Sequence, residues 1–463
     1  MRERLNQGAL RVVLLLLVVI GLSLLSILLM GRFQTARAVA QETYQYLEVF
    51  NQAVDIIQKR YVKEVEIKEL YYGAIQGMLA RLDPHSIHLP AEAFKDMKID
   101  ITGEFGGLGI EVGLRQGQLM IISPIEDTPA WRAGIKAGDL IIKIDGASTE
   151  GITLTDAVHK MRGKRGAPVI LAIIREGWVE PKNFTIVRDI ITIKSVKKTE
   201  MIDGKYGYIR LITFNVKSGQ EVQQAMQTLT ARAGGKLAGL ILDIRYNPGG
   251  PLEQALEVAD TFIAEGPIVS IKGRNPEDNK TFYAQKPNNY SGFPMIVIVN
   301  NGSASASEIV AASLQDTGRA LILGTKTYGK GSVQSLFTLK DGSGIKLTTA
   351  YYYAPSGRSI QAEGIKPDVE VEELSPEQEA LLEKERARQE QARFGEEKLP
   401  RYLTQEDVMP GETIGPEKPL EKEKPVKKTF EEEIMSDYQL RRAVELLRGW
   451  EVFQAQLKKA EAK

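Results

Sequence analysis

Residues 295–316 constrain the fold of this chain more than any other stretch. The apolar run at 295–299 predicts a buried strand, and the Asn-Asn-Gly sequence at 300–302 predicts a tight turn. An alanine-rich apolar run then extends to Leu314 and predicts a helix. A strand, a turn and a helix in this order present a side chain at a helix N-terminus, where free N–H groups stabilise negative charge.

Three serines, Ser303, Ser305 and Ser307, alternate with small residues at the start of this predicted helix. The ordinary interpretation is a serine that caps the helix. A serine in this place is also a candidate nucleophile if a base lies beside it. The chain has no cysteine, its three histidines lie far upstream, and it contains neither a GxSxG elbow nor an HExxH helix.

A lysine is the remaining candidate for the base, as in the Ser-Lys variant of the catalytic triad. Lys330 lies between Gly329 and Gly331, so the backbone can turn sharply and direct the amine inward. To accept a proton near neutral pH, a lysine pKa must fall from about 10.4 to about 7 or 8, and burial can cause such a change. The alternative is an ordinary solvated loop cation.

Four motifs carry a resemblance to a known family. They occur in the order DIRYNPGG, SASASEI, QDTGRA and GTKTYGKGSVQ. Together they resemble the carboxy-terminal processing proteases, Ser/Lys endopeptidases that contain a PDZ domain, and the resemblance covers roughly residues 45–370. It implies that Ser305 is the nucleophile, Lys330 the base and Gln334 its helper, and that no cofactor is needed.

The oxyanion of such a reaction needs two N–H donors. The amide of Ala306, directly after the nucleophile, is the first candidate. The resemblance implies that Gly249 or Gly250, in a turn after a predicted strand, supplies the second. Asp316 also matches a family position, but an intact helix would separate it from Ser305 by about 16 Å. We therefore interpret Asp316 as structural and expect it to organise the turn that follows it.

Residues 97–190 resemble a PDZ domain, a module that captures the C-terminus of a peptide. The sequence at 105–110 resembles the carboxylate-binding loop, in which successive N–H groups form an anion nest. The strand after this loop would pair with the peptide, whose last residue we expect to be apolar. The alternative is an ordinary hairpin turn. The predicted substrate-binding residues are Gly107, Leu108, Gly109, Ile110, Val158 and, as a link to the protease core, Arg175.

Strands and helices alternate over residues 195–370, which predicts a layered α/β core. The resemblance implies an α/β multidomain chain with a crotonase-like, ClpP-like core. Two other functions stay open, a non-catalytic PDZ scaffold on a protease-like core and a crotonase-like acyl-transfer enzyme. The predicted regions are a membrane segment at 1–40, a helical segment at 41–96, the PDZ domain at 97–190, the protease core at 191–371, and a charged linker with an amphipathic helix at 372–463.

An uninterrupted apolar run at residues 12–30 follows several arginines near the N-terminus. The run is long enough to span a bilayer, and the basic flank predicts that the rest of the chain is exported. We favour a retained anchor over a signal peptide cleaved after Ala40, where the sequence Ala-Val-Ala fits a cleavage site. The predicted location is therefore the extracytoplasmic or periplasmic face of the cell envelope.

Sixty basic and 60 acidic residues balance, which gives no electrostatic reason to expect nucleic-acid binding. His85 and His88 lack further ligands nearby, so we expect a capped turn there and no metal. Residues 430–457 predict an amphipathic helix that serves assembly or docks an adaptor, with packing on its own core as the alternative. The expected substrates are exported proteins with apolar C-termini. A second copy of the chain is also expected to bind, through the N- and C-terminal helices.

Overall fold

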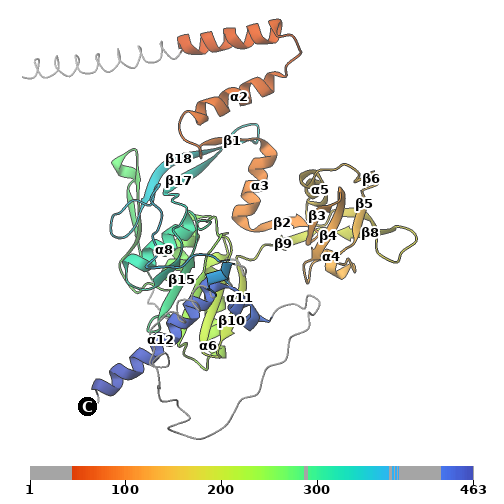
Figure 1. The fold of residues 1–463 in the computed structure, drawn as a ribbon. Coiled ribbons are helices and arrows are strands. Elements are labelled where there is room, and N and C mark those ends of the chain that lie inside the picture. Colours follow the sequence, from red (N-terminus) through yellow and green to blue (C-terminus); the bar gives the residue numbers. More distant parts are fainter. Residues whose placement is uncertain are drawn as a thin grey trace, which may run out of the picture. The chain divides into compact units, whose positions relative to one another are not determined.

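The computed structural model describes residues 44–285, 290–374, 378–379, 381–382, 384 and 429–461. The chain divides into two compact units, residues 1–88 and residues 89–463 (Figure 1). The predicted membrane span at 12–30 and the possible cleavage site at Ala40 lie outside the described residues. Within the ranges that are described, no helix is both long enough and apolar enough to cross a bilayer.

The first unit contains a helix at residues 44–60 and helix α2 (Ile67–Ala80). The turn after α2 is closed by Asp83, whose carboxylate accepts the N–H of His85 at 2.8 Å and the N–H of Ser86 at 2.9 Å. His88 packs its ring against Tyr72, with the ring centroids 4.5 Å apart. The described residues hold no cluster of three potential metal ligands. The two hydrogen bonds to Asp83 confirm the capped turn predicted for this segment. Strand β1 (Ile87–Leu89) lies at the boundary between the units.

The core of the second unit is a mostly parallel sheet with the strand order β10-β11-β12-β15-β16-β19. Only β10 runs antiparallel to its neighbour, β11. The connections between parallel strands include helices, as expected for an α/β core. The strands are β10 (Val196–Ile202), β11 (Tyr206–Leu211), β12 (Gly239–Asp243), β15 (Met295–Val299), β16 (Leu321–Gly324) and β19 (Val369–Glu370).

Helices cover both faces of this sheet. Because successive side chains of a strand point to opposite faces, Val297 packs in the cluster formed with α6, α7 and α8, whereas Ile296 and Ile298 pack in the cluster formed with α11 and α12. The strands are thus apolar on both sides, which explains their continuous apolar runs. The helices are α6 (Ser218–Arg232), α7 (Leu252–Asp260), α8 (Ala306–Asp316), α11 (Phe430–Ser436) and α12 (Tyr438–Glu461).

A second sheet follows the order β18-β13-β14, with β17 paired to β18. All of these pairings are antiparallel. A short 3-10 helix, η1 (Pro276–Asp278), joins β13 to β14. The strands are β13 (Pro267–Gly273), β14 (Lys280–Tyr283), β17 (Ser332–Thr338) and β18 (Gly344–Tyr353).

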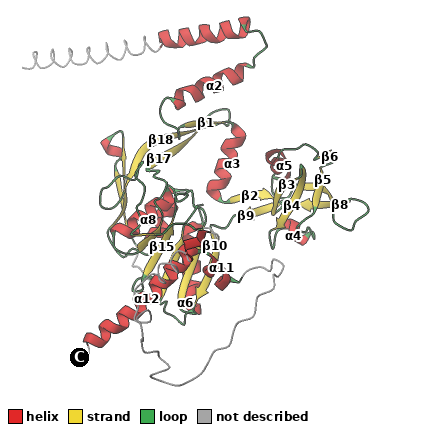
Figure 2. Cartoon of the chain, in the orientation of Figure 1, coloured by secondary structure: helices red, strands yellow, loops and turns green. Residues whose placement is uncertain are grey.

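The segment between α3 (Ala91–Thr102) and the parallel-sheet core forms a separate small sheet with its own apolar cluster (Figure 2). Its strand order is β3-β4-β5-β7-β8, with β6 paired to β5, so β3 is an edge strand. A two-stranded ribbon, β2 with β9, joins the beginning of this segment to its end. The elements are β2 (Glu104–Gly107), β3 (Ile110–Arg115), β4 (Gln118–Pro124), α4 (Pro129–Arg132), β5 (Leu140–Ile144), β6 (Ala147–Ser148), α5 (Leu154–Met161), β7 (Pro168–Ile174), β8 (Lys182–Val187) and β9 (Asp189–Thr192).

The amphipathic C-terminal stretch folds as two helices and not as the single predicted helix. The break falls at Asp437, whose carboxylate accepts the N–H of Leu440 at 3.0 Å and so caps α12. The alternative of packing on its own core is correct for the proximal part, where Leu440 and Leu447 are buried against the sheet. The distal part still exposes an apolar side, which includes Trp450 and Leu457.

We predict that Leu447→Ala lowers the free energy of unfolding by about 2–4 kcal/mol, because Leu447 is 2% exposed and its removal leaves a cavity against the sheet. Leu457→Ala, on the same helix but 47% exposed, is the matched control and should change stability by no more than about 0.5 kcal/mol. Urea denaturation of the two variants measures both values. Equal effects would contradict the docking of α12 on the core.

Candidate active site

The turn between β15 and α8 distinguishes one serine from its neighbours. Ser303 donates its hydroxyl to the Ile244 carbonyl at 2.9 Å, and Ser307 donates its hydroxyl to the Asn247 carbonyl at 2.9 Å. Both side chains are completely buried, whereas Ser305 is only partly buried. Of the three serines that the sequence offers, Ser305 is therefore the one that a substrate can reach.

The backbone of Ser305 is strained. Its φ is 56° and its ψ is −112°, in a region that residues other than glycine rarely occupy. Such strain persists only where the surrounding structure imposes it, and it is typical of functional sites. Here the imposing contacts include the Ser305 N–H, which donates to the Glu308 carboxylate at 2.9 Å.

Glu308 is a site residue that the sequence interpretation missed. Its side chain is completely buried, and its carboxylate accepts four hydrogen bonds. One oxygen accepts the N–H of Ser305 at 2.9 Å and the N–H of Lys330 at 2.8 Å, and the other accepts the Thr327 hydroxyl and the Gly329 N–H, both at 2.6 Å. The available signal was the Ser-x-x-Glu spacing of a capping box at the start of an apolar helix.

Lys330 reaches the same site from the loop between β16 and β17. Because one oxygen of Glu308 binds the backbone N–H groups of both Ser305 and Lys330, the two predicted catalytic residues are held close together. Burial is the main reason that the pKa of Lys330 lies below its usual value, and the positive charge of Lys346 lowers it further. The negative charge of Glu308 opposes this change. The net effect favours a neutral amine, the form that can accept a proton.

The predicted oxyanion loop packs directly on the turn that carries Ser305, called here the nucleophile turn after the predicted role of Ser305. A Cβ atom at Gly249 would lie 2.8 Å from the Ala306 nitrogen and 2.9 Å from the Ser305 Cβ, so only glycine fits there. The N–H of Gly249 donates to the Asn247 side chain at 3.0 Å. Among the residues that the structure describes, the Gly250 N–H makes no hydrogen bond to the backbone. Of the two glycines that the sequence left open as the second oxyanion donor, this difference therefore favours Gly250.

Gln334, the predicted helper of the base, lies on β17. Its amide nitrogen donates to the Ser332 hydroxyl at 2.9 Å and contacts the Thr348 hydroxyl at 3.3 Å. The pairing of β17 with β18 is irregular between Val333 and Gln334, which bends the strand at this point. Among the described residues, these two hydrogen bonds place the Gln334 amide against side chains of β17 and β18.

Asp316 has the structural role that its distance from Ser305 predicts, although with different partners. Its carboxylate pairs with Arg358 at 3.0 Å and accepts the N–H of Ser356 at 2.9 Å. Arg319 instead donates to backbone carbonyls, among them that of Phe262 at 3.1 Å. Asp316 therefore holds the loop after β18 and not the turn before Arg319.

The predicted peptide groove lies at the edge strand β3. Leu108 is buried, and its carbonyl accepts the Ala130 N–H at 2.9 Å, which fixes the loop before the strand. A side chain at Gly109 would collide with Thr128 at 2.2 Å. Gly107 ends β2, Ile110 begins β3, and the partly buried Val158 lies on α5, which packs against β3.

Arg175 lies at the end of β7 and makes its contacts inside the small domain. Its guanidinium binds both oxygens of the buried Asp139, at 2.6 and 2.8 Å, and also donates to the Gly134 carbonyl at 3.0 Å. The hydrogen bond with Asp139 raises the pKa of Arg175. These contacts are structural, and the predicted link from Arg175 to the protease core stays a prediction.

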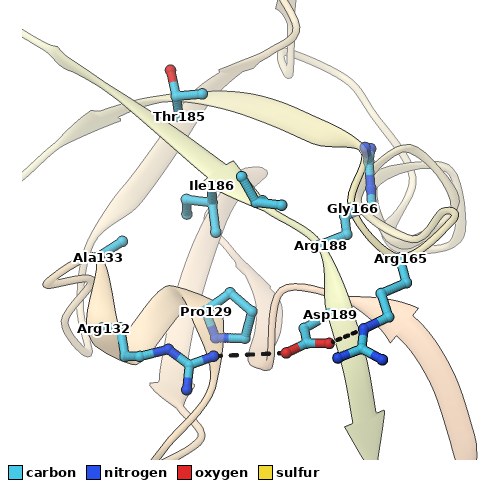
Figure 3. Close-up of a pocket in the computed structure, with 10 residues that line it drawn as sticks. Pro129, Arg132, Ala133, Arg165, Gly166, Thr185, Ile186, Arg188 and Asp189 are labelled. Atoms are coloured by element: carbon cyan, nitrogen blue, oxygen red, sulfur yellow. Dashed lines mark ion pairs between the residues drawn. The ribbon is translucent and has the colours of Figure 1, made fainter.

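A pocket of about 480 Å³ lies elsewhere on the small domain, between α4, β8 and β9 (Figure 3). Asp189 bridges two arginines there, with Arg165 at 2.8 Å and Arg132 at 3.8 Å. The Ile190 N–H, and then the two arginines, lower the pKa of Asp189. None of the predicted peptide-binding residues lines this pocket, so it is not the predicted groove.

Comparison with known proteins identifies the segments. Residues 205–371 match the model of peptidase family S41, residues 120–175 match the PDZ domain, and residues 29–93 match the N-terminal domain of the activating protease CtpB. The matched PDZ range contains α5 and most of the small sheet, and the matched peptidase range contains both Ser305 and Lys330.

Three relatives extend the similarity over most of the chain. A carboxy-terminal-processing protease of Bartonella bacilliformis is 47% identical over 338 residues, 73% of this chain and 77% of that protein. The carboxy-terminal processing protease CtpB of Bacillus subtilis is 35% identical, over 75% of this chain and 74% of its own length. A carboxyl-terminal-processing protease of Synechocystis is 36% identical, with coverages of 69% and 75%. The chain therefore belongs to the carboxy-terminal processing proteases, serine peptidases of family S41 that carry a PDZ domain.

Proposed function

We propose that Ser305 and Lys330 are the catalytic dyad of this protease. The observation that carries the proposal is the buried Glu308 carboxylate, because one of its oxygens binds the backbone of both residues. The partial exposure of Ser305 and the lowered pKa of Lys330 support it. Gln334 is the helper of the base only if its amide leaves its present partners when a substrate binds.

In the proposed reaction, neutral Lys330 accepts the proton of the Ser305 hydroxyl while Oγ attacks the scissile carbonyl. The N–H groups of Ala306 and Gly250 stabilise the oxyanion of the tetrahedral intermediate. The protonated lysine then donates to the leaving amine, which completes the acyl-enzyme. Water attacks the ester with Lys330 again as base, the lysine returns this proton to Ser305 Oγ as the ester bond breaks, and the new C-terminus is released.

We propose that substrates enter through the PDZ domain. A peptide with a free C-terminal carboxylate would bind the N–H groups of residues 107–109 and extend as an added strand on β3, whose outer edge has no neighbouring strand in the described sheet. Leu108, Ile110 and Val158 would surround an apolar terminal side chain. Peptide binding would release the catalytic domain into its active arrangement, with Arg175 as a possible link.

The core would share the crotonase-like fold. The chain would be exported and anchored in the cell envelope through residues 12–30. An adaptor protein that docks on the exposed apolar side chains of distal α12 would regulate the chain. Exposed apolar side chains on the helix at 44–60 and on distal α12 support assembly of copies through both ends.

We predict that Ser305→Ala and Lys330→Ala each reduce cleavage of an unfolded protein substrate by roughly 10³-fold or more. Lys330→Arg should be equally inactive, because arginine stays charged and cannot accept the proton. Lys326→Ala, which removes an exposed lysine from the same loop, is the matched control and should cleave normally. Substantial activity in Ser305→Ala would reject the dyad. A stable wild-type fold without any cleavage, with or without an added partner, would instead favour a PDZ scaffold.

The pH dependence of cleavage tests the lysine base separately. Activity should rise with pH through the lowered pKa of Lys330, because only the neutral amine accepts the proton. Lys346→Gln removes a nearby positive charge, so the pKa of Lys330 should rise and the acidic limb of the profile should move to higher pH. Lys340→Gln, in the exposed β17–β18 turn, should leave the limb in place. An unchanged profile in Lys346→Gln would be evidence against Lys330 as the base.

The role of the PDZ domain predicts a preference for free C-termini. The same apolar-ended substrate with an amidated terminus should be cleaved several-fold more slowly, because the anion nest loses its negative partner. Steady-state kinetics on the paired substrates measure the difference. Equal rates would leave the protease assignment intact but contradict recognition of the free C-terminal carboxylate by the PDZ domain.

A further inference from the structure

The C-terminal helix pair packs on the parallel sheet and also contacts Arg245, just before the proposed oxyanion glycines. The helix pair lies outside the matched peptidase segment, which ends at residue 371, whereas the core side of the contact lies inside it. The contact joins Asp437 and Gln439, at the start of α12, to Arg245, which follows β12.

Arg245 has no free donor in this arrangement. Its Nε and Nη2 donate to the buried Asp243 at 3.0 and 2.6 Å. Its Nη1 and Nη2 donate to the two oxygens of Asp437 at 3.0 and 2.6 Å, and Nη1 also donates to Gln439 at 3.1 Å. The five N–H groups of the guanidinium are thereby all used. Since the Arg245 side chain is only 8% exposed, loss of Asp437 would leave buried donors without a partner.

The backbone after Arg245 runs straight into the active site. Tyr246 has a positive φ of 53° and donates its N–H to the Asn300 side chain at 2.9 Å. The carbonyl of Asn247 then accepts the Ala304 N–H at 3.0 Å, and its side chain accepts the Gly249 N–H at 3.0 Å. A shift at Arg245 therefore moves residues that contact both the nucleophile turn and the oxyanion loop.

A second contact connects the same helix end to the loop of the base. The Gln439 amide donates to the Val371 carbonyl at 2.7 Å, and the Val371 N–H donates to the Gly324 carbonyl at 2.9 Å. Gly324 ends β16 and is followed by the loop that carries Lys330. The start of α12 is thus connected to the ends of β12 and β16. These strands lead into the proposed oxyanion loop and into the loop of Lys330.

We propose that Asp437 is a positioning residue for catalysis, which acts through Arg245 to hold the oxyanion loop against the nucleophile turn. The C-terminal helix pair is then part of the catalytic unit and not only an appendage for assembly. The inference rests on the proposed oxyanion role of Gly250 and Ala306. It concerns the chemical step, so it predicts a change in kcat with little change in KM.

Asp437→Asn in the full-length protein tests the proposal, because asparagine still caps α12 but cannot form the charged pair with Arg245. We expect kcat for a peptide substrate to fall roughly 10- to 100-fold while KM stays within about twofold, as for a small misplacement of catalytic groups. The inhibition constant of a matching peptide aldehyde, whose adduct oxygen occupies the oxyanion site, should rise by a similar factor. Asp437→Glu, which keeps the charge, should recover part of the activity.

Arg448→Gln is the matched control. Arg448 lies on the same helix and pairs with Asp203 at 2.8 Å on the surface, away from Arg245. This variant should keep its kcat, and thermal melting should show both variants folded at the assay temperature. Wild-type kcat in folded Asp437→Asn would overturn the proposal, as would an equal loss in Arg448→Gln. If Asp437→Asn does not fold, kcat and the aldehyde inhibition constant are measured for Asp437→Glu. Wild-type values of both would then overturn the proposal. An active Ser305→Ala enzyme would instead reject the proposed dyad, so the two failures are distinguishable.

Discussion

The proposed active site depends on one buried carboxylate and the four hydrogen bonds that converge on it. A buried negative charge is costly unless donors surround it, and Glu308 accepts the N–H groups of Ser305 and Lys330, that of Gly329 and the hydroxyl of Thr327. The same charge has an opposing effect on the base, since it raises the pKa of Lys330. Burial and the neighbouring Lys346 outweigh it. Glu308 thus positions Ser305 and Lys330, whereas burial and Lys346 lower the pKa of Lys330.

The parallel sheet explains how residues far apart in the sequence meet at this carboxylate. Strands β12, β15 and β16 are neighbours, and their carboxyl ends lie at the same edge of the sheet. The proposed oxyanion loop follows β12, Ser305 follows β15, and the loop of Lys330 follows β16. Sites at the carboxyl ends of neighbouring parallel strands are usual in α/β proteins. Helix α12 covers one face of the same strands and reaches their ends through Asp437 and Gln439.

Several parts of this arrangement could be predicted from the sequence. The strand, turn and helix at 295–316, the glycine turn at 247–250 and the edge strand after Gly109 all depend on local patterns, and the structure contains each of them. Other assignments could not be made reliably. The capping box that includes Glu308 was visible, but its bonds to Thr327, Gly329 and Lys330 join segments that are distant in sequence. The present partners of Gln334, Asp316 and Arg175 also differ from those expected, because each is decided by packing between elements.

The sequence by itself determined the alternation of strands and helices in the core, the apolar character of the core strands and the residues that resemble a Ser/Lys peptidase. These follow from side-chain periodicity, turn chemistry and motif spacing, which act over a few residues. The tertiary structure alone decided which serine stays accessible, that Glu308 joins the backbones of Ser305 and Lys330, and that the C-terminal stretch bends at Asp437 to bind Arg245. The physical reason is that burial and hydrogen-bond partners depend on which distant segments pack together, and a local pattern does not contain that information.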